Sequence, residues 1–268
     1  MTDANRDRLY RETLLAPLRT SAAYLPKMGG GDEVDLPGFT DLYGADPLYH
    51  WMGLDSPLMF AAHKAAGGMT SVYRQLGIGC ERLFRQVLRD ELHLSEEQVK
   101  WSYQVLPDSE DETKKARTLS LDGRVELSDV RDDAASERVE AWIEQQQRAL
   151  AITVPLKGAV FEVRQGYKSA DSKRQNADLA NAAQALGHGY LPVLTIMSTQ
   201  INNVVRARYL TGNWSVLLGT VGAGDPLHST FDFVAKVIGF DLAAFFERST
   251  DDLRAGLEDV LRHLLEAK

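Results

Sequence analysis

Polar side chains gather at the end of one strongly apolar segment, where they could take part in chemistry. Segment 158–168 has the sequence GAVFEVRQGYK, and it carries Glu162, Arg164, Gln165 and Lys168. Burying such groups costs several kcal/mol unless each of them finds a partner. The pattern therefore predicts a buried strand whose charged end belongs either to a functional site or to a structural ion pair.

Alternate side chains of an extended strand point to the same face, so Glu162, Arg164 and Lys168 are expected to share one face. Gly166 lies between them and marks a possible bulge, which would re-aim Lys168. Carboxylate oxygen is the ligand that Mg²⁺ prefers, and a neighbouring cation can orient water and stabilise developing negative charge. This combination is suited to metal-assisted cleavage of a phosphodiester.

We expect a magnesium site here to use a second carboxylate besides that of Glu162. Asp122 is the first upstream candidate, at an Asp-Gly dipeptide that is typical of a turn. Glu126 and Asp129 follow it on the next expected strand. Glu81 lies on an expected helix and could reach inwards, although an ordinary solvent-facing glutamate fits its position as well. The residues alone leave these alternatives open.

The elements that position these side chains follow from periodicity and turn residues. Gly77 and Gly79 either weaken the start of one helix or allow another backbone to approach it. The expected order is helix 1–20, an irregular arm over 22–66 with one short helix, helix 71–94, strand 99–106, a hairpin over 117–129 that turns at Asp122-Gly123, helix 133–150, strand 158–168, helix 172–186, strand 191–198, helix 199–210, strand 214–219, and helices near 230–247 and 250–266.

This order predicts an α/β protein with a mixed central β-sheet flanked by helices, an N-terminal arm and C-terminal helices. We expect a helix and irregular arm over 1–70 and one compact α/β unit over 71–268. A mixed pattern of strands with helices between them leaves no clear domain boundary inside the second range.

Charge is distributed unevenly along the chain. The protein has 268 residues and a net charge of −8, which taken alone argues against a nucleic-acid partner. Segment 157–209, however, contains seven basic and three acidic residues, so its net charge is +4 and the remainder carries −12. A DNA-binding cleft in an otherwise acidic protein has this distribution, and so does a solvated helix face.

Cys80 is the single cysteine, so no intrachain disulfide is possible. No run of about 18 apolar residues is present, and the N-terminus lacks the basic-then-apolar pattern of a signal peptide. These features predict a protein without membrane spans in a reducing cytoplasm.

Two polar clusters follow the expected strands and are candidates for DNA contact. The first opens helix 172–186, where free backbone N–H groups bind phosphate. The second follows strand 191–198 and is rich in amides, which read adenine in the major groove. A capped polar helix and turn hydrogen bonds explain the same residues without DNA. The candidates are Ser169, Lys173, Arg174, Gln175, Asn176, Gln200, Asn202, Asn203 and Arg206.

Three stretches together resemble the ApaLI-like type II restriction endonucleases: VFEVRQGYKSADSKRQNADL, YRQLGIGCERLFRQVLRDEL and LSLDGRVEL. The resemblance runs from about residue 73 to residue 246. It implies the PD-(D/E)XK nuclease fold, whose core is helix, three strands, helix and strand. It also implies Mg²⁺-dependent cleavage of double-stranded DNA at a short palindrome, with GTGCAC as the family's namesake target.

Carried over residue by residue, the resemblance makes Glu162 the second acid of the motif and Asp122 the first. The motif's lysine falls at Arg164, which is a departure, because an arginine orients water but does not lose its proton. Lys168 or Gln165 could take that role instead, and we expect Lys168→Ala to lose more activity than Arg164→Ala. The implied catalytic residues are Asp122, Glu162, Arg164 and Lys168, and the implied Mg²⁺ ligands are Asp122, Glu162 and Glu81.

Two other functional classes remain open from the sequence. The Arg164 departure permits a DNA-binding protein with a degenerate nuclease site, and the acidic net charge favours a soluble metabolic α/β enzyme. Cleavage of both strands of a palindrome needs two equivalent sites, so the nuclease interpretation predicts a homodimer. Its expected interface lies on the C-terminal helix or on segment 199–210.

Overall fold

The computed structural model of the chain describes residues 3–28, 31–105, 117–166 and 172–266. Its contacts divide the chain into two compact units. The first unit combines Met1–Gly79 with Glu247–Lys268, and the second is Cys80–Phe246. This division differs from the expected boundary at residue 70, because the end of the chain groups with its beginning.

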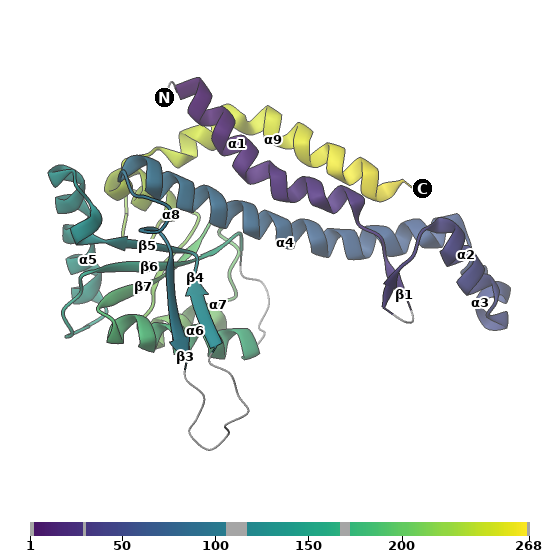
Figure 1. Ribbon diagram of the computed structural model, residues 1–268, viewed down its shortest axis with the longest axis horizontal. Helices are drawn as coiled ribbons and strands as arrows, with labels where there is room; N and C mark the ends of the chain where they lie inside the picture. Colours follow the sequence, from purple (N-terminus) through teal and green to yellow (C-terminus); the bar gives the residue numbers. More distant parts are fainter. Residues whose placement is uncertain (1–2, 29–30, 106–116, 167–171, 267–268) are drawn as a thin grey trace, which may run out of the picture. The chain divides into compact units, whose positions relative to one another are not determined.

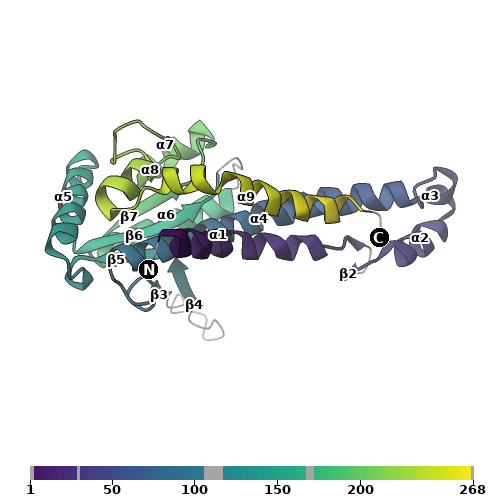
Figure 2. The ribbon, with the colours of Figure 1, turned by 90° about the horizontal axis from the view of Figure 1, so that it is seen from above.

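The first unit consists of helices and one short antiparallel ribbon. Figures 1 and 2 show α1 and α9 lying side by side in it. Its elements are α1 (Asp3–Arg19), a 3-10 helix (Thr20–Ala23), β1 (Lys27–Met28), β2 (Asp32–Glu33), α2 (Leu36–Gly44), α3 (Pro47–Trp51), the first part of α4 (Pro57–Glu91) and the last part of α9 (Leu242–Leu265).

Helices α1, α4 and α9 pack closely in the first unit. A methyl group on Gly79 of α4 would lie 2.5 Å from the carbonyl oxygen of Leu14 in α1, so only glycine allows this approach. Asp7 of α1 accepts two hydrogen bonds from Arg248 of α9, at 3.0 and 3.2 Å. The shared apolar core contains Leu15, Leu18, Val72, Val260 and Leu264.

The N-terminal arm is more regular than its sequence predicted. Two short helices, α2 and α3, replace the single expected one, and α4 begins at Pro57 rather than near residue 71. Gly67 and Gly68 dilute the apolar pattern of α4, yet they do not break it. A methyl group on Gly68 would lie 2.6 Å from Leu264, and one on Gly67 would collide with Tyr24. Close packing, which periodicity does not reveal, explains both glycines.

The second unit contains a four-stranded mixed sheet of order β5-β6-β7-β8. Strand β5 is antiparallel to β6, while β6, β7 and β8 run parallel. The prediction of an α/β protein with a mixed sheet is therefore confirmed. The elements are β3 (Trp101–Val105), β4 (Arg117–Leu121), β5 (Gly123–Glu126), α5 (Asp133–Ala149), β6 (Gly158–Arg164), α6 (Ser172–Gly187), β7 (Tyr190–Ile196), α7 (Asn203–Thr211), β8 (Ser215–Leu217) and α8 (Thr230–Phe233).

Helices cover both faces of this sheet, and Figure 1 shows α6 and α8 on opposite sides of it. On one face, Phe161 of β6 contacts Phe84 of α4 and Phe233 of α8. On the other face lies a core built from β6, β7 and β8 with α6 and α7, which contains Val160, Ala182, Ala185, Leu194, Ile196, Val205, Tyr209, Trp214 and Val216. Because side chains alternate, Glu162 and Arg164 belong to this second face.

The expected hairpin over 117–129 is not formed. Strand β4 pairs with β3 in a separate antiparallel sheet, whereas β5 pairs with β6. The chain passes from one sheet to the other at Asp122, whose N–H donates to the carbonyl of Phe161 at 2.8 Å. The N–H of Arg124 donates to the carbonyl of Val99 at 2.8 Å. Long-range pairing of this kind overrides the local turn preference of an Asp-Gly dipeptide.

The C-terminal helices also differ from those expected. Helix α8 ends in a π-helical turn, Val234–Ile238, and Gly239 then adopts a left-handed conformation with φ of 108°. Such a glycine is a usual helix terminator. The following helix, α9, continues without interruption through residues 248–249, where the sequence suggested a break. Within the described residues, no helix combines the length and apolar character that crossing a membrane requires.

Candidate active site

Glu162 is a buried acid on the central strand β6, with 6% of its surface exposed. Arg164 lies two residues further along the same strand and therefore on the same face. A terminal nitrogen of Arg164 contacts a carboxylate oxygen of Glu162 in an ion pair. The strand places the two groups together because their spacing matches its two-residue repeat.

Asp122 approaches β6 from the neighbouring strand connection. Its Oδ2 accepts a hydrogen bond from the N–H of Val163 at 2.8 Å, and its own N–H donates to Phe161. These two backbone groups flank Glu162 in the sequence. The carboxylate of Asp122 is consequently fixed at the edge of β6, beside the strand position that carries Glu162.

Two further acids complete the cluster. Asp178 on α6 is buried, and one of its oxygens lies 3.8 Å from Arg164 Nη2. The hydroxyl of Tyr209, a fully buried side chain on α7, donates to the same oxygen of Asp178. Glu81 on α4 is half-buried, and its negative charge raises the pKa of Glu162.

Burial and charge both act on the acid at the centre of the cluster. Desolvation raises the pKa of Glu162 above its ordinary value, although Arg164 opposes this rise. The carboxylates of Asp122, Asp178 and Glu81 raise it further. An acid in this environment holds its negative charge at a cost, and a nearby cation would relieve that cost.

Arg164 responds in the opposite way. Burial disfavours its charge, but the carboxylates of Glu162, Asp178 and Asp122 outweigh burial and raise the pKa of Arg164. The guanidinium therefore stays charged. Arg85 is a further cation at this place, and its Nε donates to the backbone carbonyl of Asp122 at 2.8 Å. In this group of described residues, the four carboxylates outnumber the two cations.

The other two candidates for a first acid lie at the opposite end of β6. Glu126 pairs in register with Gly158, where β6 begins. It accepts a hydrogen bond from Tyr190 at 2.5 Å and lies 3.5 Å from Lys157. Asp129 pairs with Arg124 at 3.1 Å. Acids and cations balance in this network, which has the character of a structural ion-pair cluster. The structure brings Asp122, and neither Glu126 nor Asp129, next to Glu162.

The expected DNA-contacting residues fall into two groups. Lys168 and Ser169 lie outside the described residues, as do the side chains of Lys173, Arg174, Gln175 and Asn176 at the start of α6. The second group follows β7. There Asn202 caps α7, its Oδ1 accepting from the N–H of Val204 at 2.9 Å, while Gln200 and Asn203 are exposed and Arg206 is half-buried.

These loops come from one end of the sheet. Strands β6 and β7 are parallel, so the segments that follow them leave the same edge. A methyl group on Gly166 would lie 2.9 Å from Ser198 Oγ, which shows that the two segments touch. The exposed amides after β7 therefore emerge at the edge of the sheet where β6 ends with Arg164.

Sequence reasoning missed Asp178 and Tyr209. A signal for Asp178 was present, because it lies on the same face of α6 as Ala182 and Ala185, at spacings of four and three. An acid on the apolar face of a helix is either paired or functional. Tyr209 carried no such signal, since a buried tyrosine is a common core residue.

The donor set fits a magnesium ion in its chemistry. Asp122 and Glu162 supply hard oxygen ligands, and the surplus of carboxylates around them favours a divalent cation. Among the described residues, no group of three or more His, Cys, Asp or Glu side chains is arranged to hold a metal ion on its own. Mg²⁺ commonly uses only one or two carboxylates, with water and substrate phosphate as its other ligands. Asp122 and Glu162 meet that requirement.

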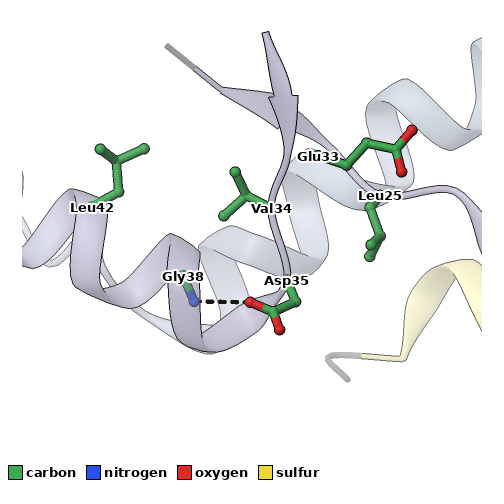
Figure 3. A pocket seen from close by; sticks show the side chains of 6 residues that line it. All are labelled: Leu25, Glu33, Val34, Asp35, Gly38 and Leu42. Carbon is green, nitrogen blue, oxygen red and sulfur yellow. Dashed lines mark hydrogen bonds between the residues drawn. The ribbon is translucent and has the colours of Figure 1, made fainter. Parts of the chain in front are cut away.

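A hollow in the first unit offers a different kind of environment. Figure 3 shows Leu25, Val34 and Leu42 on its walls, with the carboxylates of Glu33 and Asp35. Asp35 Oδ1 accepts a hydrogen bond from the N–H of Gly38 at 3.0 Å and thereby caps α2. Exposed carboxylates beside aliphatic side chains provide no paired acid and base, so this hollow has less catalytic potential than the cluster on β6.

Comparisons with protein-family models, with curated proteins and with solved structures found no match to this chain. The family resemblance of the sequence motifs accordingly stays a prediction.

Proposed function

We propose that this protein is a type II restriction endonuclease, which hydrolyses double-stranded DNA with Mg²⁺ at a short palindrome, GTGCAC by resemblance. The observation that carries the proposal is that two acids lie next to each other at β6, Glu162 on the strand and Asp122 on the connection between β4 and β5. Asp122 is hydrogen-bonded to the backbone of Val163, next to the buried Glu162, and Arg164 lies beside them. Two adjacent carboxylates can hold Mg²⁺ together with water and substrate phosphate, and a cation beside them can stabilise developing negative charge.

The order of elements around the acids supports the same proposal. Helix α4 precedes β3, β4 and β5, and β6 is followed by α6 and then by the parallel strand β7. The core of the PD-(D/E)XK fold, which we propose for the second unit, has a helix, three strands, a helix and a strand, so one of the four strands β3 to β6 is additional to that core. Helix α5 is then an insertion between the two acid-bearing elements.

The roles of the side chains follow from their chemistry. Asp122 and Glu162 would hold Mg²⁺, which supplies a Lewis acid for the scissile phosphate and lowers the pKa of bound water. Glu81, held on α4, is the third proposed acid. Arg164 keeps its charge and stabilises negative charge on the phosphate, but it does not serve as a base. Arg164 contacts Glu162, while Lys168, the other candidate for this position, lies outside the described residues.

Substrate binding is assigned to the edge of the sheet where β6 and β7 end. Exposed amides after β7 and the basic start of α6 both follow strands that end there. Phosphate contacts would fix the register of the duplex, while amide side chains would read base edges. A homodimer would present two such edges to a palindrome.

A second candidate is a DNA-binding protein that has lost cleavage. The ion pair between Glu162 and Arg164 favours it, because this contact neutralises the acid that a metal requires. The two candidates differ in whether Glu162 becomes available to a metal ion.

Incubation of the protein with supercoiled plasmid and phage DNA distinguishes these possibilities. The proposal predicts discrete fragments with Mg²⁺ and none with EDTA, and sequencing of the fragment ends gives the recognised bases. Salt-sensitive DNA binding without cleavage would select the second candidate. Absence of both binding and cleavage would reject both and favour a metabolic enzyme.

A further inference from the structure

Arg164 lies between two buried carboxylates from different elements. It forms an ion pair with Glu162 on its own strand, and its Nη2 lies 3.8 Å from Asp178 Oδ2 on α6. Its Nε is buried and has no hydrogen-bond partner in the part of the chain that the structure describes. The guanidinium is thus held through its terminal nitrogens, and a small movement would carry it from Glu162 towards Asp178.

Asp178 is itself fixed in place. It is 4% exposed, and the hydroxyl of the fully buried Tyr209 donates to the oxygen that faces Arg164. Since Tyr209 is on α7 and Asp178 on α6, this contact ties two helices to the end of β6. The Tyr209 hydroxyl is neutral, so Arg164 is the cation that faces this oxygen of Asp178.

We infer that Asp178 and Tyr209 are positioning residues that provide Arg164 with a second carboxylate, so that Glu162 can bind a metal while the arginine remains in the site. This inference rests on the proposed function. Glu162 cannot fully neutralise the charge of Arg164 while it also binds a metal ion. Without Asp178, release of Glu162 would leave a buried guanidinium without a paired charge, which is costly.

A purely structural role for the contact between Tyr209 and Asp178 makes a different prediction. A link between α6 and α7 would affect stability alone. The chain offers a matched control, because Tyr190 is also buried and donates to Glu126 at 2.5 Å, within the balanced network at the far end of β6. Tyr190→Phe removes the same kind of hydrogen bond but leaves Arg164 untouched.

The test measures Mn²⁺ binding to the full chain without DNA, by electron paramagnetic resonance, for folded variants. Arg164→Ala should bind Mn²⁺ more tightly than the wild type, because it frees Glu162. Asp178→Asn should bind it about tenfold more weakly, within the usual range of coupling between contacting residues. Tyr209→Phe, which changes less volume, should weaken binding in the same direction, and Tyr190→Phe should not change it.

The decisive comparison combines the substitutions. In the Arg164→Ala background, Asp178→Asn and Tyr209→Phe should no longer weaken Mn²⁺ binding. Weakening that persists there would make Asp178 a metal ligand in its own right and would overturn the inference. Unchanged binding in Asp178→Asn and Tyr209→Phe, weaker binding in Arg164→Ala, or no binding by the wild type would overturn it too.

Plasmid cleavage separates this inference from the proposed function. If the variants show the expected pattern of Mn²⁺ binding but the wild type cuts no DNA, the nuclease proposal is rejected, and the positioning role of Asp178 and Tyr209 is retained. A protein that cuts DNA without the pattern rejects the positioning role alone.

Discussion

At the scale of single residues, Asp122 combines a structural and a proposed chemical role. Its Oδ2 accepts from the N–H of Val163, whose side chain is fully buried. Removing this acceptor leaves a buried N–H without a partner, while removing only the charge does not. The two roles can therefore be separated by two substitutions at one position.

Asp122→Ala should lower the free energy of unfolding by about 1–3 kcal/mol, the usual cost of an unsatisfied buried group. Asp122→Asn keeps an oxygen acceptor and should stay within about 0.5 kcal/mol of the wild type. Both should lose DNA cleavage, because each removes a carboxylate. Urea denaturation and cleavage assays check this. Equal stability of the two variants, or cleavage by Asp122→Asn, would contradict the assigned roles.

Cys80 gives a prediction that is independent of function. Burial, with a smaller effect from the neighbouring Glu81, raises the pKa of its thiol to about 12. Because the thiolate is the reactive form, the native protein should not react with a disulfide reagent at pH 8. The same protein in urea should react fully. Rapid labelling under native conditions would show that the end of α4 opens readily.

The sequence predicted part of the candidate site for a clear physical reason. Glu162 and Arg164 are neighbours through the two-residue repeat of one strand, which is local information. Asp178 and Tyr209 join them from α6 and α7, and such contacts depend on how the helices pack on the sheet. Asp122 was expected in a hairpin turn, but it lies at a crossing between two sheets, next to Glu162, and its role as the first acid stays a prediction.

At the scale of elements, the positions of the central strands and helices could be predicted, because polar residues mark where each apolar segment of the sequence ends. The runs that form β6, β7 and α6 were expected close to their observed positions. The extent of α4 and of the arm was not, because the glycines of α4 reflect contacts with residues distant in the sequence. Close approach to Leu14, in particular, cannot be read from the spacing of apolar residues around Gly79.

Gly77 and Gly79 on α4 should respond oppositely to alanine. A methyl group at Gly79 would meet the Leu14 carbonyl, whereas one at Gly77 would have no neighbour within 4 Å. Gly79→Ala should cost about 1–3 kcal/mol through overpacking. Gly77→Ala should stabilise the protein by up to about 1 kcal/mol, through helix propensity. Thermal and urea denaturation measure both, and a neutral Gly79→Ala would argue against close packing of α1 and α4.

At the scale of the whole molecule, the uneven charge and the acid cluster on β6 bear on assembly. The chain carries −8 overall but +4 over 157–209, the segment that contains β6, α6, β7 and most of α7. In the described part of the chain, we identify one such cluster, while cleavage of a palindrome requires two. The nuclease proposal therefore depends on pairing of two chains.

Light scattering should detect a dimer, either of the protein alone or on a duplex that contains GTGCAC. Increasing salt should weaken the complex with the duplex, since basic residues displace counterions from phosphate. A duplex without the palindrome serves as the control. A protein that remains monomeric under all these conditions, yet cuts both strands, would contradict the proposed symmetric dimer.

The central claim is that the buried acid of β6 belongs to a hydrolytic site, and one measurement tests it most directly. Plasmid cleavage with Mg²⁺ is followed for the wild type, for Glu162→Gln and for Glu126→Gln, whose acid lies in the balanced network at the other end of the strand. We expect a loss of at least about a hundredfold for Glu162→Gln and a change below about threefold for Glu126→Gln. Cleavage at the wild-type rate by a folded Glu162→Gln variant would contradict it.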